Sequence, residues 1–289
     1  MDLSARRQPP TVRLRRLASE LRGLRTTAGL TREEVSDQTG INPATLYRIE
    51  TAKVRPQRRT LMALLDTYGV TDEARRSELI ALSRQATQLG WLQQFESELP
   101  EQYTTYISFE GDARSIRNYE SLFVPGLLQT EEYARAIIKG VLPFASDDEV
   151  EHRVEARLQR QEVLRKKHPL RLWAILDEAV LHRRVGGTTV MVKQLQALVT
   201  AANQPHITLQ VIPFSSGAHT GMLGSFVVMD FPDPADPDLV YIDSMAGDLF
   251  LERAPDLRRF TMLFDHLQAL ALDPSGSVRM IEAQADAIT

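Results

Sequence analysis

The sequence predicts an α+β protein, with an all-α N-terminal domain followed by a mixed α/β C-terminal domain of about five strands. Residues 10–70 place apolar side chains three and four positions apart, with glycines and capping residues between the runs. From residue 115 onward, short apolar runs bounded by turn residues predict strands. The charge divides in the same way: residues 1–60 hold 13 lysines and arginines against 6 acidic residues, and the remainder holds 21 against 32.

Length and composition narrow the class of protein. A chain of 289 residues has room for two domains, and 43% hydrophobic residues is ordinary for a globular protein. The absence of cysteine excludes disulfides, thiolate metal sites and cysteine nucleophiles, and suits the cytoplasm. No apolar run approaches the roughly 20 residues of a membrane span, so we expect no membrane association.

The N-terminal domain begins with a predicted helix. Its apolar stripe is formed by Leu14, Leu17, Leu21 and Leu24, and Gly29 ends it. A further helix with inward Leu61, Leu64, Leu65 and Tyr68 closes the domain. Between the two lies the segment on which the functional prediction depends.

That segment, residues 31–50, has the caps of two short helices joined by a tight turn. Thr31 and Glu34 form a capping box, and Gly40 supplies the positive φ that ends the first of these helices. Asn42 is a favourable N-cap, and Pro43 fits the first helical position because its missing N–H is not needed there. The second helix therefore follows the first at once.

The apolar positions of this segment predict which face is buried. The inward side chains are Val35, Ile41, Leu46 and Ile49. The outward side chains are Asn42, Ala44, Thr45 and Arg48. This arrangement is a helix-turn-helix, whose second helix enters the major groove of DNA.

The segment LRGLRTTAGLTREEVSDQTGINPATLYRIETAKVRPQRRTLMALLDTYGV resembles the lambda-repressor and Cro-like (XRE) family over about residues 14–70. The AGLT turn, the G-I step after the second helix and the RIE ending of the third carry the resemblance. It implies that Arg25 pairs with Glu50. Arg32 departs from the family, which often has a glutamine at this position in contact with the DNA backbone. An arginine can still bind a phosphate there. Pro43 replaces a residue that contacts a base edge in several relatives.

Seven residues are predicted to contact double-stranded DNA. They are Arg32, Asn42, Ala44, Thr45, Arg48, Lys53 and Arg55. Arg48 is the foremost base-contacting candidate, because a guanidinium paired with guanine O6 and N7 is the commonest specific contact. Asn42 and Thr45 come next, and the Ala44 methyl group suits a thymine methyl group. The alternative for Asn42 is that it only caps its helix.

The predicted domains are residues 1–72, a connecting helix over residues 73–98, and a sensor and dimerisation domain over residues 99–289. The connecting segment has Leu79, Leu82 and Leu89 inward. Trp91 is expected in the core of the second domain, with a subunit contact as the alternative.

The second domain is predicted from its patterns in chain order. Strands are expected over residues 115–124, 171–181, 207–214, 224–231, 238–244 and 248–252, and helices after Thr130, from Ser146 to about residue 167, after Gly187 and over residues 255–272. The strand–helix–strand unit of residues 171–214 predicts parallel strands, and the close spacing of the last three predicts antiparallel pairing. The tail after Pro274 is expected to be partly ordered at most.

The stretches YESLFVPGLLQTEEYARAII, RLQRQEVL, LWAILDEAVLHRRVGG, ITLQVIPFSSGAHTGMLGSFVVMDF and DLVYID resemble the C-terminal domain of a large class of actinomycete helix-turn-helix regulators. Those proteins are described as antitoxin-like and are often encoded beside a small partner protein. With both halves, the resemblance covers about residues 14–272. It implies a transcription regulator without identifying its signal.

No catalytic, metal or cofactor site is predicted in this domain. The six histidines lack zinc-binding spacings, and the loop with Ser215, Ser216 and His219 lacks a nucleophile elbow, so we expect no enzyme. Glycines in that loop suit a ligand site at the carboxyl end of a strand. The candidate ligand or partner residues are Ser216, His219, Met222 and Tyr241. The alternative is a loop that only links two strands.

Two functions follow from the sequence. The first is a cytoplasmic, nucleoid-associated transcription regulator that binds a palindromic operator as a homodimer, since two half-sites double the base contacts of one domain. Its second domain would receive a small-molecule effector or a partner. The second is an antitoxin-like protein that binds a small partner protein and autoregulates the pair.

Overall fold

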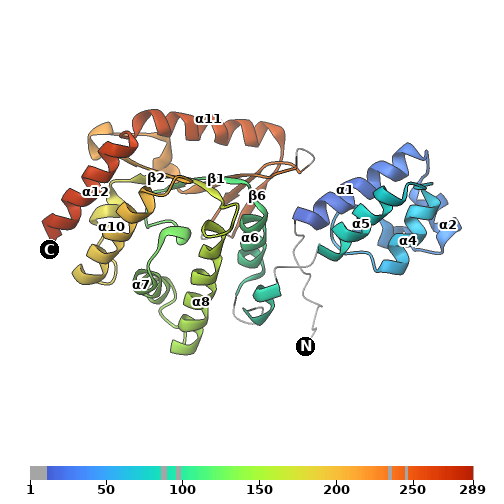
Figure 1. Cartoon of the computed structure of the whole chain (residues 1–289), viewed down its shortest axis with the longest axis horizontal. Coiled ribbons are helices and arrows are strands. Elements are labelled where there is room, and N and C mark those ends of the chain that lie inside the picture. The colour runs from blue at the N-terminus through green and yellow to red at the C-terminus, as the bar shows by residue number, and fades with distance from the viewer. Residues whose placement is uncertain (1–11, 86–89, 96–98, 234–235, 245–246, 289) are drawn as a thin grey trace. The chain divides into compact units, whose positions relative to one another are not determined.

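The computed structural model of the chain describes residues 12–85, 90–95, 99–233, 236–244 and 247–288. The chain forms two compact units (Figure 1). The first takes residues up to 96 together with 100–109, and the second takes 97–99 together with 110–289. The three-part division predicted from the sequence stays a prediction, and parts of its connecting segment, residues 86–89 and 96–98, lie outside the described residues.

The first unit is a helical domain with one core. Its helices are α1 (Val12–Thr27), α2 (Arg32–Thr39), α3 (Pro43–Glu50), α4 (Arg58–Thr67) and α5 (Glu73–Gln85). The predicted inward side chains Val35, Leu46 and Ile49 are fully buried in this core, and Ile41 packs against it half-buried. The apolar stripes of five helices thus meet around one centre.

Helix α5 belongs to this core, although the sequence suggested a connecting role. Leu79 and Leu82 lie among the buried side chains of α1 and α4. On the surface, Arg75 forms an ion pair with Glu20 of α1. The predicted inward position of Leu89 lies outside the described residues. A short 3₁₀ helix follows over Gly90–Phe95, where the rings of Trp91 and Phe95 meet edge to face at 6.0 Å.

The second unit is built on a six-stranded mixed sheet in the order β3-β2-β1-β4-β5-β6. The strands are β1 (Ser115–Glu120), β2 (Arg171–Asp177), β3 (Ile207–Ile212), β4 (Phe226–Asp230), β5 (Leu239–Ile242) and β6 (Leu249–Leu251). Strands β1, β2 and β3 are parallel, and β4, β5 and β6 add antiparallel pairs, which confirms the predicted pairing directions. The predicted count of about five is corrected to six. Strand β1 ends before residue 124 and β2 before residue 181.

Helices cover both faces of the sheet (Figure 1). They are α7 (Glu131–Val141), α8 (Asp147–Arg160), α9 (Ala179–His182), α10 (Thr188–Ala202), α11 (Ala254–Leu270) and α12 (Pro274–Ile288). Helix α6 (Glu101–Asp112) is divided between the units, with its residues up to 109 in the first and from 110 in the second. Helix α11 packs Phe264 and Leu267 against Tyr119 and Ile175 on one face. Helices α7, α8 and α10 lie on the opposite face.

Helix α12 corrects the prediction of a mostly disordered tail. It packs against α10 and β3, and its buried side chains are Ser277, Ile281 and Ala285. The Ser277 hydroxyl accepts the Val211 amide at 2.9 Å. Because two of these three side chains are small and one is polar, the buried stripe of α12 carries a weak hydrophobic signal.

Candidate nucleic-acid interface

The turn between α2 and α3 has the predicted capping chemistry. The Thr31 hydroxyl accepts the Glu34 amide at 3.2 Å, and the Glu34 carboxylate accepts the Thr31 amide at 2.8 Å. That backbone hydrogen bond lowers the pKa of Glu34. Gly40 has a φ of 71° and donates its amide to the Ser36 carbonyl. Two short helices are therefore held in the helix-turn-helix arrangement by local bonds.

Helix α3 presents the predicted outward residues. Asn42, Ala44 and Arg48 are exposed, and Thr45 is half-buried. Asn42 caps the helix through its Oδ1, which accepts the Ala44 amide at 2.8 Å. The cap uses only the carbonyl oxygen of the side chain, so the amide nitrogen keeps its capacity to donate to a base edge. Both roles considered for Asn42 are therefore compatible.

The arginine pairing implied by the family resemblance is present, with an addition. Arg25 donates to Glu50 through Nε at 2.6 Å and Nη2 at 3.2 Å, and this hydrogen bonding raises the pKa of Arg25. Arg32 also donates its Nε to Glu50, at 2.8 Å. The buried Glu50 carboxylate thus holds one arginine from α1 and one from α2. Arg32 is predicted to contact phosphate, and the ion pair fixes where its guanidinium lies.

Tyr47 is an outward residue that the sequence analysis did not single out. The residue is 45% exposed. The guanidinium carbon of Arg32 lies 5.4 Å from the ring centroid, and Lys53 Nζ lies 5.3 Å from it. The signal available in the sequence was a lone aromatic side chain next to Arg48 on an otherwise small and polar face.

The loop after α3 is fixed at its start. The Arg48 carbonyl accepts the Lys53 amide at 2.7 Å and the Val54 amide at 3.2 Å. Ala52 has a φ of 56°, the left-handed region that non-glycine residues rarely adopt, and its methyl group is buried against Leu14 and Ala18 of α1. The side chain of Lys53 is exposed at this point.

The candidate ligand residues of the second unit do not gather at one place. Ser216, His219 and Met222 share the loop of residues 213–224, which follows β3. His219 is 4% exposed and lies 3.2 Å from an Asp177 carboxylate oxygen through Nε2, whereas Met222 is 68% exposed. The Ser216 hydroxyl donates to the Leu270 carbonyl at 3.3 Å.

Tyr241 is buried on β5, away from that loop, and packs its ring 5.2 Å from Phe250. Successive side chains of a strand point to opposite faces. Val240 faces the core that contains Tyr119, so Tyr241 lies on the other side of the sheet. His219 packs edge to face on Tyr119, at 6.2 Å.

Buried polar groups lie at the carboxyl ends of β1 and β2. Among the described residues, Tyr119 Oη, His219 Nδ1 and Glu120 Oε2 are buried without a hydrogen-bond partner. Burial raises the pKa of Tyr119, and it raises the pKa of Glu120 to about 7. Within the described segments, no group of three or more histidine, aspartate or glutamate side chains is placed to hold a metal ion.

Two family models match the sequence. A model described as a helix-turn-helix domain matches residues 16–79. A model described as a domain of unknown function (DUF5753) matches residues 103–283, which is more than half of the chain. The chain belongs to the DUF5753 family. No curated protein and no solved structure matches it.

In this DUF5753 protein, each of the two candidate sites lies within a different family match. The helix-turn-helix match contains all seven residues predicted to contact DNA, and the DUF5753 match contains the loop of residues 213–224. The helix-turn-helix match, together with the capping geometry of α2 and α3, makes the first unit a helix-turn-helix domain. No helix in the described part of the chain is long and apolar enough to cross a membrane.

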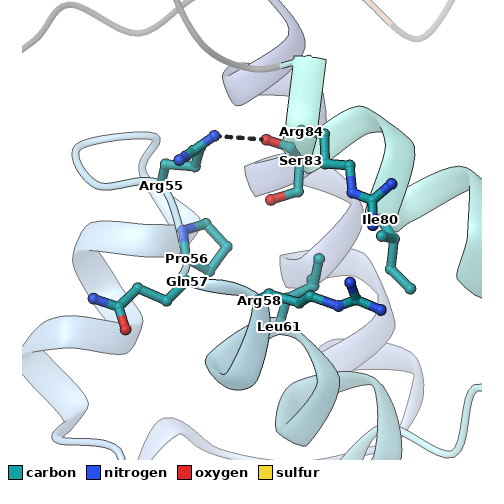
Figure 2. A pocket seen from close by; sticks show the side chains of 8 residues that line it. All are labelled: Arg55, Pro56, Gln57, Arg58, Leu61, Ile80, Ser83 and Arg84. Atoms are coloured by element: carbon teal, nitrogen blue, oxygen red, sulfur yellow. Dashed lines mark hydrogen bonds between the residues drawn. The ribbon is translucent and has the colours of Figure 1, made fainter.

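The helix-turn-helix domain of the DUF5753 protein also has a hollow beside the loop after α3 (Figure 2). The residues that line it are Arg55, Pro56, Gln57, Arg58, Leu61, Ile80, Ser83 and Arg84. Arg55 lies on one side, where its Nη1 donates to the Ser83 carbonyl at 3.3 Å, and Arg58 and Arg84 lie on the other. Arg58 begins α4, whose N-cap makes no side-chain hydrogen bond, so the first amides of α4 add to the positive potential of this hollow. The sequence analysis named only Arg55 here.

Proposed function

We propose that the chain is a sequence-specific transcription regulator of the XRE type that binds double-stranded DNA in the bacterial nucleoid. The outward face of α3 carries the proposal. It combines hydrogen-bonding and cationic side chains, Asn42 and Arg48, with a small residue, Ala44, that permits close approach to base edges. Lys53 and Arg55 follow it on the loop and suit backbone phosphates. The proposal assigns no catalytic reaction to the chain.

The proposal includes a homodimer on a palindromic operator. One helix-turn-helix domain offers few base contacts, and two half-sites about 10 base pairs apart double them. The second unit supports this part of the proposal by its size and its separate core. In the proposal, the second unit joins the subunits and receives a small-molecule effector or a partner. The buried polar groups around His219 mark the place where we expect that signal to act.

Mapping of bound DNA across the source genome tests the proposal, followed by titration of the best site at two salt concentrations. We expect a short inverted repeat that binds far more tightly than random DNA. Broad binding without a sequence motif would contradict the sequence-specific role.

Replacement of Arg48 with alanine tests the predicted base contact. Arg48→Ala should relax the preference at one base position by about 1–3 kcal/mol, because one bidentate contact is removed. Equal losses of affinity on the operator and on random DNA would contradict a base contact of Arg48. The matched variant Arg32→Ala should weaken all sequences and lower the salt slope by about 1.

A second candidate function is the binding of a small partner protein, as in the antitoxin-like hypothesis. The observation that favours it is a set of large apolar side chains exposed near the carboxyl ends of the parallel strands: Leu122 (55%), Phe214 (57%), Met222 (68%) and Leu223 (92%). Exposed apolar patches are typical of protein interfaces. Co-purification with the product of the neighbouring reading frame, and its loss in Leu223→Ser, would support this candidate. Recovery of the chain without that product would count against it.

A further inference from the structure

Tyr47 is a large exposed ring in a helix that does not need it for packing. The buried side of α3 is made by Leu46 and Ile49, and Tyr47 lies on the other side, where the residue is 45% exposed. Among the described residues, the structure records no hydrogen bond to the Tyr47 hydroxyl. Core packing therefore leaves both the ring and its hydroxyl group unexplained.

Two cations lie beside the Tyr47 ring. The Arg32 guanidinium comes from α2 and lies 5.4 Å from the ring centroid, and the Lys53 ammonium comes from the loop after α3 and lies 5.3 Å from it. Each cation is attracted by the ring, but the two repel each other. Two cations beside one exposed tyrosine make a positively charged surface that suits an anion.

The ion pairs of Arg32 leave positive charge at this place. Arg32 donates its Nε to Glu50, and the same carboxylate is shared with Arg25. Two guanidinium groups and one carboxylate have a net charge of one positive unit, and Lys53 adds a second. The Nη atoms of Arg32 are not used in its bond to Glu50, and its side chain is 30% exposed.

We propose that Arg32, Tyr47 and Lys53 form one binding site for a backbone phosphate of DNA. In this site the Tyr47 hydroxyl donates a hydrogen bond to a phosphate oxygen, and Arg32 and Lys53 supply the balancing charge. The contacts of both cations with one ring place them beside the Tyr47 side chain, and in the proposed site all three groups bind the same phosphate. The inference rests on the proposed DNA-binding function and adds Tyr47 as a positioning contact.

In this proposal Tyr47 contacts a backbone phosphate, whereas its neighbour Arg48 contacts a base. A phosphate contact fixes the position of the helix on the duplex but does not distinguish bases, whereas a base contact does. Loss of the Tyr47 hydroxyl should therefore weaken the operator and random DNA alike. Because the hydroxyl is neutral, its loss should not change the salt slope, which counts the phosphates neutralised by cations.

The experiment is a titration of the full chain with two fluorescent duplexes, the mapped operator and a random sequence of the same length, at two salt concentrations. We expect Tyr47→Phe to bind both duplexes about threefold to tenfold more weakly with an unchanged salt slope. Lys53→Gln should lower the slope on both by about 1. Tyr47→Ala, which also removes the ring, should bind more weakly than Tyr47→Phe.

Two matched variants serve as controls. Tyr68→Phe removes a buried hydroxyl that has no hydrogen-bond partner, and Arg258→Gln removes an exposed cation of the second unit. Both should bind as the wild type does. Wild-type affinity of Tyr47→Phe on both duplexes would overturn the inference, and so would a loss confined to the operator, which would indicate a base contact. If the wild type binds neither duplex at low salt, the proposed function fails together with the inference.

Discussion

Each unit contains a buried glutamate bound by arginine, and the two sites differ in their charge balance. In the second unit, Arg160 donates Nε and Nη2 to the two oxygens of Glu110, both at 2.8 Å, and the side chains are 5% and 1% exposed. In the first unit, Glu50 is 2% exposed and accepts from Arg25 and Arg32, which are 13% and 30% exposed.

The number of arginines bound to each glutamate decides the net charge of the site. The Glu110–Arg160 pair balances its own two charges and is closed to water, so it contributes to the packing of the second unit. A carboxylate shared by two arginines keeps a net positive charge, and the more exposed arginine brings that charge to the surface beside α3. The same two residue types therefore contribute fold stability in one unit and a positive surface in the other.

The largest effect is expected at the closed pair. Glu110→Gln removes the carboxylate charge that the buried Arg160 guanidinium binds through two hydrogen bonds. We expect the free energy of unfolding of the second unit to fall by about 3–5 kcal/mol. Urea unfolding can be followed through Trp173 on β2 in a Trp91→Phe background, because the chain has two tryptophans.

The control for that prediction replaces both partners. Glu110→Leu combined with Arg160→Met leaves no unpaired charge and should cost far less than the single change. A loss below about 1 kcal/mol in Glu110→Gln would show that charge balance does not stabilise this site.

Glu120 of the second unit is a third case, a buried carboxylate that has no arginine among the described residues bonded to it. Glu120 accepts from Asn118 Nδ2 at 3.3 Å, and burial raises its pKa from 4.5 to about 7. The folded state therefore binds the proton more tightly than the unfolded state. Protonation of Glu120 therefore stabilises the folded state. This stabilisation is complete below pH 4.5 and is lost as the pH rises to about 7.

Glu120→Gln removes this dependence on pH. At pH 8 the variant should be more stable than the wild type by about 3 kcal/mol, and the difference should shrink steadily toward pH 5. Urea unfolding of both chains from pH 5 to pH 8 measures it, since the other groups titrate equally in the two. A difference that stays constant over this range would contradict the assignment.

The smallest effect on stability is expected at the shared carboxylate. Glu50→Gln leaves Arg25 and Arg32 without their counterion, but both retain access to water. We expect a loss of about 2 kcal/mol in the first unit, which corresponds to roughly 30-fold faster hydrogen exchange in α3 when exchange requires unfolding of the unit. Glu33→Gln, the same change at an exposed position, should leave the exchange unaltered. Exchange in Glu50→Gln at the wild-type rate would contradict the role of Glu50.

Features decided within a few residues were predictable from the sequence. The Thr31–Glu34 box, the positive φ of Gly40 and the Asn42 cap each depend on partners at most four positions apart, and all are confirmed. The parallel pairing of β2 and β3 followed from the length of their connection, and it is confirmed. The contacts of these residues with DNA stay predictions.

Features decided by distant partners were not predictable. Arg32 and Glu50 are 18 residues apart, so their ion pair has no local signature. Helix α6, over Glu101–Asp112, contains two tyrosines, two threonines, one isoleucine and one phenylalanine. The intrinsic preference of these residue types favours strands, and the sequence alone did not predict this helix. Packing decides the conformation in such segments, as it does in α12.

The left-handed residue Ala52 has a consequence for binding entropy. A glycine there would adopt the same φ freely, but it would have no methyl group to pack against Leu14 and Ala18. The packed methyl group fixes the end of α3 against α1, so the loop that carries Lys53 is held in place without any ligand. If a phosphate binds at the proposed site, the ordering of this loop is already completed when the chain folds, so less conformational freedom is lost on binding.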